Sequence, residues 1–123
     1  MTPKVLIVDD EPNIVISLEF LMKRRGYQTL VARDGDEALA AVETFRPDLV
    51  LLDVMLPRRD GFEVCQLLRA DGWTDLKIVM LTAKGREAEM AKGMDVGADS
   101  YVTKPFSTRD LVDHVARILE GDR

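Results

Sequence analysis

Residues 4–12 read KVLIVDDEP, in which four consecutive apolar side chains are followed directly by three carboxylates and a proline. An apolar run without alternation is typical of a strand that is buried on both faces, as in a parallel sheet covered by helices. Similar runs recur as YQTLVA over 27–32, DLVLL over 48–52, KIVML over 77–81 and YVT over 101–103. We therefore expect five buried strands, the second being the weakest run.

Helix signals lie between these runs. Pro12 suits the first turn of a helix and Gly26 suits a C-terminal cap, so a helix is predicted between them. GDEALAAVETF over 35–45 places its apolar residues on one stripe, and Pro47 prevents continuation. Three further helices are predicted, starting at Asp60 with Glu63 completing an approximate capping box, spanning 86–96, and starting at Ser107.

Strand and helix thus alternate along the whole chain. This alternation predicts one parallel sheet with right-handed crossovers and helices on both faces, a doubly wound α/β fold of three layers. A chain of 123 residues is long enough for one substantial core and too short for two. We predict a single domain over residues 1–123.

Composition excludes several classes of function. A net charge of −5 and an isoelectric point near 4.9 argue against sequence-independent binding to nucleic acid or anionic lipid. Cys65 is the only cysteine, so no internal disulfide forms, and this usage fits a reducing compartment. The start MTPK lacks the features of a signal peptide, and no apolar run approaches the ~20 residues that span a bilayer. We expect a cytoplasmic protein without membrane or direct nucleic-acid contacts.

Reactive side chains follow four of the five predicted strands. They are Asp9 and Asp10 after the first strand, Asp53 after the third, Thr82 after the fourth and Lys104 after the fifth. Ligands of open α/β sheets bind beyond the carboxyl ends of the strands. In sheets of strand order 2-1-3-4-5 these four strands are consecutive neighbours, so their ends face one crevice. Lys104 then has to reach back across about 14 Å of strands.

Three carboxylates in one crevice favour a hard divalent cation, Mg²⁺ or Mn²⁺, over zinc or copper. Magnesium commonly takes one or two carboxylates together with a substrate phosphate, which leaves one carboxylate to react. Carboxylates can attack phosphorus to give an aspartyl phosphate, and positioning and charge neutralisation catalyse most of such a transfer. Asp53 lies centrally among the strand ends, so it is the predicted nucleophile.

The segments VLIVDDEP, PDLVLLDVMLPRRDGFEV, IVMLTA and GADSYVTKPF occur in an order and spacing that resemble the receiver domain of two-component response regulators. The resemblance covers essentially the whole chain. It implies a flavodoxin-like fold with strand order 2-1-3-4-5. It also implies that Asp53 accepts a phosphoryl group from a histidine kinase or a phosphotransfer protein. Asp9, Asp10, Asp53 and the backbone carbonyl of Met55 would hold Mg²⁺, or Mn²⁺.

The same resemblance assigns roles to the remaining strand ends. Thr82 would donate a hydrogen bond to a phosphoryl oxygen, and Lys104 would pair with another. A cis peptide bond is implied before Pro105, which would aim the lysine inward. Such a domain catalyses its own phosphorylation and dephosphorylation, and it works as a signalling switch rather than as a turnover enzyme.

Tyr101 matches the family's aromatic switch position, at which inward rotation accompanies movement of Thr82. The motion would remodel the surface formed by the helix over 86–96, the strand over 101–103 and the last helix. An output domain or a downstream protein would read this surface. A homodimer through it stays open, because Ser100 and His114 stand where winged-helix members of the family usually carry charges.

Three other functions compete with this one. A flavin mononucleotide module needs a Ser/Thr/Gly-rich phosphate loop after the first strand, whereas DDEPN over 9–13 would repel a phosphate. A haloacid dehalogenase-type phosphatase needs Asp-x-Asp-x-Thr, and Asp53 is followed by Val54 and Met55. The third is a receiver-like scaffold for protein binding that is never phosphorylated, and it remains the alternative.

Overall fold

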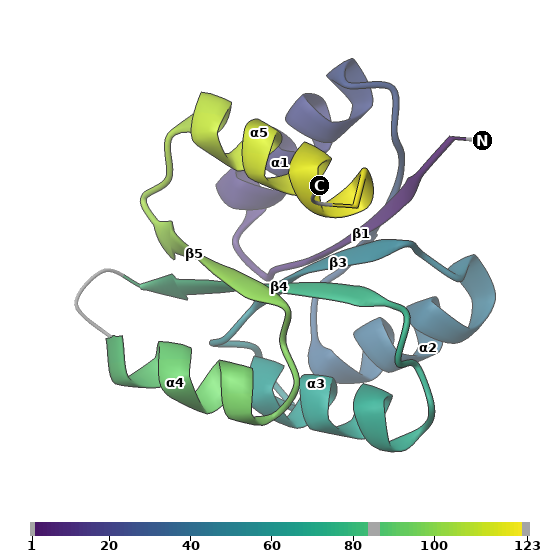
Figure 1. The fold of residues 1–123 in the computed structure, drawn as a ribbon, viewed down its shortest axis with the longest axis vertical. Coiled ribbons are helices and arrows are strands. Elements are labelled where there is room, and N and C mark those ends of the chain that lie inside the picture. The colour runs from purple at the N-terminus through teal and green to yellow at the C-terminus, as the bar shows by residue number, and fades with distance from the viewer. Residues whose placement is uncertain (1, 84–86, 122–123) are drawn as a thin grey trace.

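The computed structural model describes residues 2–83 and 87–121. Its strands form one parallel sheet of order β2-β1-β3-β4-β5 (Figure 1). The strands are β1 (Lys4–Val8), β2 (Gln28–Ala32), β3 (Leu49–Asp53), β4 (Lys77–Ala83) and β5 (Ser100–Lys104). The helices are α1 (Pro12–Arg24), α2 (Gly35–Phe45), α3 (Gly61–Ala70), α4 (Glu87–Asp95) and α5 (Thr108–Leu119). The predicted doubly wound fold and its strand order are confirmed.

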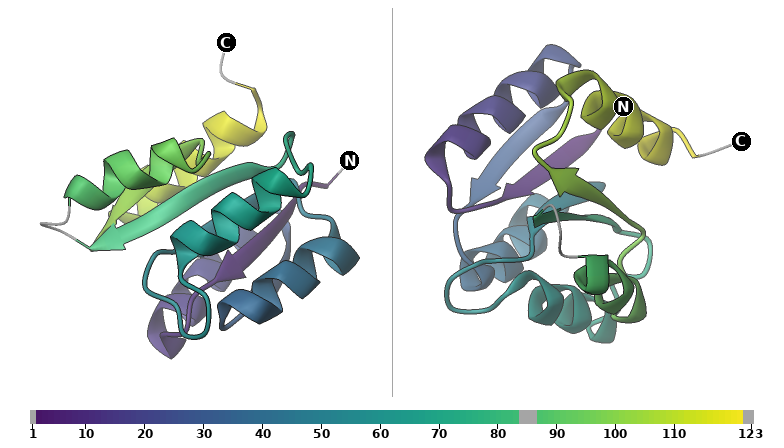
Figure 2. Two further views of the ribbon diagram at one scale, coloured as in Figure 1. Left: turned by 90° about the horizontal axis from the view of Figure 1, so that it is seen from below. Right: turned by 90° about the vertical axis from the view of Figure 1, so that its left-hand side faces the viewer.

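Helices cover both faces of the sheet. Figures 1 and 2 show α1 and α5 on one face and α2, α3 and α4 on the other. Successive side chains of a strand point to opposite faces, so β1 contributes to both cores. Val5 and Ile7 pack in the cluster that contains residues of α1 and α5, whereas Leu6 and Val8 pack in the cluster on the opposite face. The central strands are therefore buried on both sides, as their sequences predict.

The two edge strands differ from that prediction. On β2, Leu30 is 39% exposed, and on β5, Tyr101 is 42% exposed. An edge strand has a hydrogen-bonded neighbour on one side only, and the helices of a doubly wound fold cover the middle of the sheet better than its edges. The prediction that these runs are buried on both faces was wrong for β2 and β5.

The helix boundaries follow the predicted caps closely. α1 begins at Pro12, and Gly26 lies just beyond its end with a φ of 94°. The side chain of Asp60 accepts a hydrogen bond from the Glu63 amide at the start of α3. The capping box is incomplete, however, because the Glu63 carboxylate accepts from Arg59 at 2.8 Å.

The remaining helices agree with the predicted segments. Ser107 caps α5 by accepting from the Asp110 amide at 3.4 Å. The helix predicted over 86–96 is found as α4, and its predicted first residue, Arg86, lies outside the described residues.

Within the described part of the chain, no helix has the length and apolar character that crossing a membrane requires.

Candidate functional site

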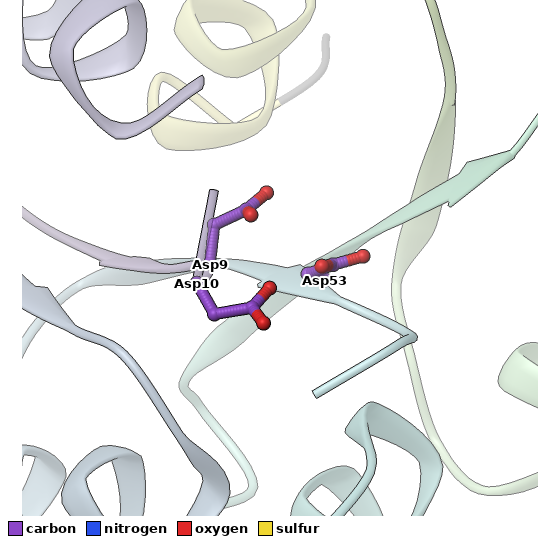
Figure 3. Close-up of side chains that lie close together, drawn as sticks. All are labelled: Asp9, Asp10 and Asp53. Atoms are coloured by element: carbon purple, nitrogen blue, oxygen red, sulfur yellow. The ribbon is translucent and has the colours of Figure 1, made fainter. Parts of the chain in front are cut away.

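The carboxyl ends of β1 and β3 bring three aspartates together. One carboxylate oxygen from each of Asp9, Asp10 and Asp53 lies within 4.8 Å of the others. Figure 3 shows the carboxylates of Asp9 and Asp10 extending toward the side on which Asp53 lies. Asp9 and Asp53 are buried, whereas Asp10 is exposed. The cluster therefore has one side open to solvent, from which a ligand can enter.

Asp53 is the last residue of β3, and its side chain is shielded from water. The residue is 6% exposed, and the Met55 amide donates a hydrogen bond to its Oδ1 at 3.3 Å. Burial and then the charge of Asp9 raise the pKa of Asp53 to about 6, although Lys104 and the Met55 hydrogen bond act in the opposite direction. A buried carboxylate beside others holds its proton more tightly because its ionised form loses hydration and is repelled.

Lys104, at the end of β5, reaches the aspartates as predicted. Its Nζ donates to Asp9 Oδ2 at 2.8 Å, and it lies 3.6 Å from Asp53 Oδ1 and 4.0 Å from Glu11 Oε1. Burial alone would lower the pKa of Lys104, but the hydrogen bond to Asp9 and the nearby carboxylates outweigh burial and raise it. The side chain of Lys104 therefore stays protonated and brings a positive charge into the crevice. The peptide bond to Pro105 is cis, in agreement with the resemblance.

Thr82 is buried close to the end of β4, one position beyond Leu81, which pairs with Asp53 in the sheet. Its residue is 1% exposed, and its hydroxyl has no hydrogen-bond partner. Among the described residues, only Thr29 shares this condition. Buried polar groups in proteins are nearly always hydrogen-bonded, so this hydroxyl is an exception near the carboxyl end of the sheet.

Two of the residues that the sequence predicts to act in the site, Met55 and Tyr101, lie at the surface. Met55 is 59% exposed and stands two residues after Asp53, to whose Oδ1 its amide donates a hydrogen bond. Tyr101 lies on the edge strand β5 with 42% of its surface exposed, and it lines a cavity of about 310 Å³ together with Phe106 and His114. His114 Nε2 lies 2.6 Å from Ser100 Oγ. Tyr101 is thus not part of the carboxylate crevice.

The donor set fits a hard dication. All three side chains offer carboxylate oxygens, the ligands that Mg²⁺ prefers, and none offers nitrogen or sulfur. Asp9 already accepts from Lys104 and, through Oδ1, from the Glu11 amide at 3.0 Å. Its position is therefore fixed before any ion binds. The acidic cluster is compatible with Mg²⁺ binding.

Sequence reasoning missed the role of Gly61, the first residue of α3. A Cβ atom at this position would lie 2.4 Å from the Asp53 carbonyl oxygen and 2.9 Å from the Val54 Cα. The Gly61 amide donates to the Val54 carbonyl at 2.9 Å. Only a residue without a side chain lets α3 approach the end of β3 so closely. A glycine directly after the cap residue, where other residues are better helix formers, was the available signal.

Comparison with known proteins agrees with this geometry. A family model of the response regulator receiver domain matches residues 5–116. The chain is 49% identical, over 119 residues, to the alkaline phosphatase synthesis transcriptional regulatory protein PhoP of Bacillus subtilis. The alignment covers 97% of this chain and 49% of PhoP, so the chain spans about half the length of that relative.

Solved structures give the same result. A protein of Chloroflexus aurantiacus assigned as a response regulator superposes with a TM-score of 0.92 at 36% identity, covering 98% of this chain and 99% of that one. The receiver domain of the Francisella response regulator 1452 superposes with a TM-score of 0.91 at 31% identity, covering 99% and 100%. The BeF3-activated DrrB receiver domain superposes with a TM-score of 0.87 at 32% identity, covering 98% and 99%. The chain belongs to the family of response regulator receiver domains of two-component signal transduction.

Proposed function

We propose that this receiver domain accepts a phosphoryl group on Asp53 from a histidine kinase or a phosphotransfer protein. The observation that carries the proposal is the surroundings of this carboxylate. Asp53 lies within 4.8 Å of the carboxylates of Asp9 and Asp10 and 3.6 Å from the ammonium group of Lys104. Thr82, whose hydroxyl has no hydrogen-bond partner, lies one position beyond Leu81, the residue that pairs with Asp53 in the sheet. The carboxylate of Asp53, which would be the nucleophile, thus lies at the same end of the sheet as the ammonium group of Lys104 and the hydroxyl of Thr82.

In the proposed step, a carboxylate oxygen of Asp53 attacks the phosphorus of a phosphohistidine. The O–P bond forms as the P–N bond breaks, the electron pair of the P–N bond goes to the imidazole nitrogen, and the imidazole takes up a proton from solvent if its charge requires it. The attacking oxygen has to be ionised. With a pKa of about 6, most Asp53 side chains are ionised at pH 7, so the raised pKa preserves reactivity while it increases basicity.

The other residues stabilise the transferred group. Asp9, Asp10, Asp53 and the Met55 carbonyl would hold Mg²⁺, and the bound ion would neutralise negative charge on the phosphoryl oxygens. Lys104 would shift from its contact with Asp9 toward the new phosphoryl oxygens. The Thr82 hydroxyl would donate to another of these oxygens, which would give it the hydrogen bond that it lacks.

A conformational switch would follow from the same contacts. Movement of Thr82 toward the phosphoryl group would be accompanied by inward rotation of the Tyr101 ring, which is 42% exposed, as the resemblance implies. The surface formed by α4, β5 and α5 would change with it, since phosphorylation biases an equilibrium between two arrangements. A downstream protein, an output domain or a second copy of the chain would read this surface. The greater length of PhoP supports an output domain.

Mass spectrometry with a small phosphodonor tests the proposal. The protein is incubated with Mg²⁺ and acetyl phosphate, and we expect a mass gain of about 80 Da that alkali removes. Asp53→Asn should show no gain, and chelation of Mg²⁺ should prevent it. If the wild-type protein gains no mass and its spectra do not change when beryllofluoride is added, the alternative is supported, a scaffold that is never phosphorylated.

A further inference from the structure

The loop between β3 and α3, residues 54–60, carries Met55, and it is held at its far end by Arg59. The Nε atom of Arg59 donates to Asp36 Oδ1 at 2.8 Å, and its Nη1 atom donates to Glu63 Oε2 at 2.8 Å. Asp36 lies in the first turn of α2 and Glu63 in the first turn of α3. One guanidinium group therefore ties the loop to two helices. A lysine could not reproduce this, because only the planar fork of arginine presents donors to two carboxylates in fixed directions.

The backbone of the loop lies directly on the start of α2. A Cβ atom at Gly35 would lie 2.4 Å from the Arg59 carbonyl oxygen and 2.5 Å from the Arg59 Cβ. The Gly35 amide donates to the Pro57 carbonyl at 3.4 Å, and the Arg59 amide donates to the same carbonyl at 2.8 Å. Residues 57–59 are therefore packed directly against the start of α2. The ion pairs therefore act on a segment that is already in contact with α2.

The near end of the loop is held by the site itself. Gly61 and Leu56 donate their amides to the Val54 carbonyl at 2.9 Å and 3.2 Å, and the Met55 amide donates to Asp53 Oδ1 at 3.3 Å. Met55 thus lies between two fixed points, the end of β3 and the Arg59 contacts.

We propose that Arg59 is a positioning residue for the cation site, because it fixes the loop that carries Met55, whose amide donates to Asp53 Oδ1. This inference rests on the proposed function, in which the Met55 carbonyl is a metal ligand. The Arg59 side chain is 41% exposed, and its partners Asp36 and Glu63 are 54% and 47% exposed. Exposed ion pairs contribute little to the stability of a whole domain. Loss of Arg59 should therefore act locally on Met55 and on the affinity for the ion, and hardly on the melting temperature.

The test compares Arg59→Gln with Arg25→Gln. Arg25 is a matched control, because its side chain is 45% exposed and it forms an ion pair with Glu120 at 3.8 Å, remote from the aspartates. Mg²⁺ affinity is measured by nuclear magnetic resonance titration, following the amide signals of Asp53 and Met55. Hydrogen exchange of the Met55 amide is measured separately without metal. Arg59→Lys is included as a variant that keeps the charge and loses the fork.

Arg59→Gln should weaken Mg²⁺ binding by about 3- to 10-fold, as expected when a group that holds a ligand is lost. It should also accelerate exchange of the metal-free Met55 amide by about 5-fold or more, since the loop opens more often. Arg59→Lys should lie between wild type and Arg59→Gln, and Arg25→Gln should match the wild type in both measurements.

Two results would overturn the inference. The first is a Met55 exchange rate and a Mg²⁺ affinity that agree between Arg59→Gln and Arg25→Gln. The second is a lowered melting temperature of Arg59→Gln with unchanged Met55 exchange, which would make Arg59 a stabilising surface residue only. If the wild-type protein binds no Mg²⁺, the metal part of the proposed function fails, and exchange of the Met55 amide alone then decides whether Arg59 positions the loop.

Discussion

Asp53 is ionised at a position where burial and neighbouring carboxylates oppose ionisation, which raises its pKa from 3.8 to about 6. In the unfolded chain the same side chain would titrate near its ordinary pKa. The folded protein therefore binds this proton more tightly than the unfolded chain does. The contribution of Asp53 protonation to the free energy of unfolding is fully present below about pH 4. It falls as the pH rises toward 6, and it is lost above 6.

We predict that Asp53→Asn stabilises the metal-free protein at pH 7.5. One pKa unit corresponds to about 1.4 kcal/mol, so the free energy of unfolding should rise by roughly 1–3 kcal/mol. The gain should shrink as the pH is lowered toward 4, where the wild-type side chain is protonated in both states. Urea denaturation of both proteins, in EDTA over this pH range, measures the difference. A variant that is less stable than the wild type at pH 7.5 would contradict the prediction.

Asp10 should control the response to magnesium. Millimolar Mg²⁺ should raise the melting temperature of the wild type, because it binds the folded aspartate cluster only. At ten times the dissociation constant the gain is about 1.4 kcal/mol, which corresponds to roughly 5 °C for a domain of this size. Asp10→Asn should melt higher than the wild type without metal, since it removes one of three clustered charges, and should no longer respond to Mg²⁺.

Differential scanning fluorimetry in EDTA and in Mg²⁺ measures both effects, with Ca²⁺-free buffers so that no other hard cation competes. A wild-type protein whose melting temperature is the same with and without Mg²⁺ would argue strongly against a metal site at these aspartates.

At the scale of elements, the start of α3 is fixed by a glycine that touches β3. We predict that Gly61→Ala lowers the free energy of unfolding by about 1–3 kcal/mol or more, because its methyl group would overlap the Asp53 carbonyl. Gly93, inside α4, is the matched comparison. A Cβ atom there would lie at ordinary contact distances, 3.4 Å from Met80 Cγ and 3.7 Å from Phe62.

Gly93→Ala should be neutral or should stabilise the protein by up to about 1 kcal/mol, since alanine is the better helix former. Urea denaturation distinguishes the two variants. Equal effects of both substitutions would mean that α3 can shift away from β3 without loss, and that the close approach at Gly61 is not needed.

Element boundaries were largely predictable because their signals are local. Pro12, Gly26 and the cap residues Asp60 and Ser107 act on the backbone within a few positions, and the helices start and end next to them. Burial at the sheet edges was not predictable in the same way. Tyr101 and Val102 are apolar like the residues of a central strand, and the place of β5 at the edge of the sheet leaves Tyr101 partly exposed.

At the scale of the whole molecule, Arg69 joins segments that are far apart in the sequence. From the last turn of α3 it donates to the carbonyls of Gly97 and Leu76 at 2.9 and 2.7 Å, and to Asp99 Oδ2 at 2.8 Å. Asp99 in turn accepts from the Ile78 amide at 2.8 Å. The side chain of Arg69 is only 18% exposed. It therefore links α3 to the starts of β4 and β5.

We predict that Arg69→Met destabilises the protein by roughly 2–4 kcal/mol, because it leaves several carbonyls and a carboxylate without their donor. Arg24→Met serves as the control, since Arg24 is exposed and lies over the Phe20 ring. This control should change the free energy of unfolding by about 0.5 kcal/mol or less. Chemical denaturation of both variants tests the comparison, and similar values for the two would refute it.

In the candidate site too, some residues could be predicted from local sequence signals, whereas contacts between distant residues could not. Asp9, Asp10, Asp53, Thr82 and Lys104 could be proposed from the sequence because each lies at or near the carboxyl end of a strand, and parallel strands end at one edge. The contacts of Arg59 and Arg69 were not found. An arginine side chain can reach many partners, so the spacing of residues in the sequence does not indicate which carboxylates or carbonyls it meets.

The position of β5 has a mechanical consequence for the crevice. Asp9, Asp10 and Asp53 follow or end strands that have hydrogen-bonded neighbours on both sides, whereas β5, which carries Lys104, is bonded to β4 alone. Displacing β5 strains one ladder of hydrogen bonds, and displacing β3 strains two. The crevice is therefore stiff on its acidic side and compliant on its basic side, so a new negative charge would draw the lysine and its strand toward the aspartates.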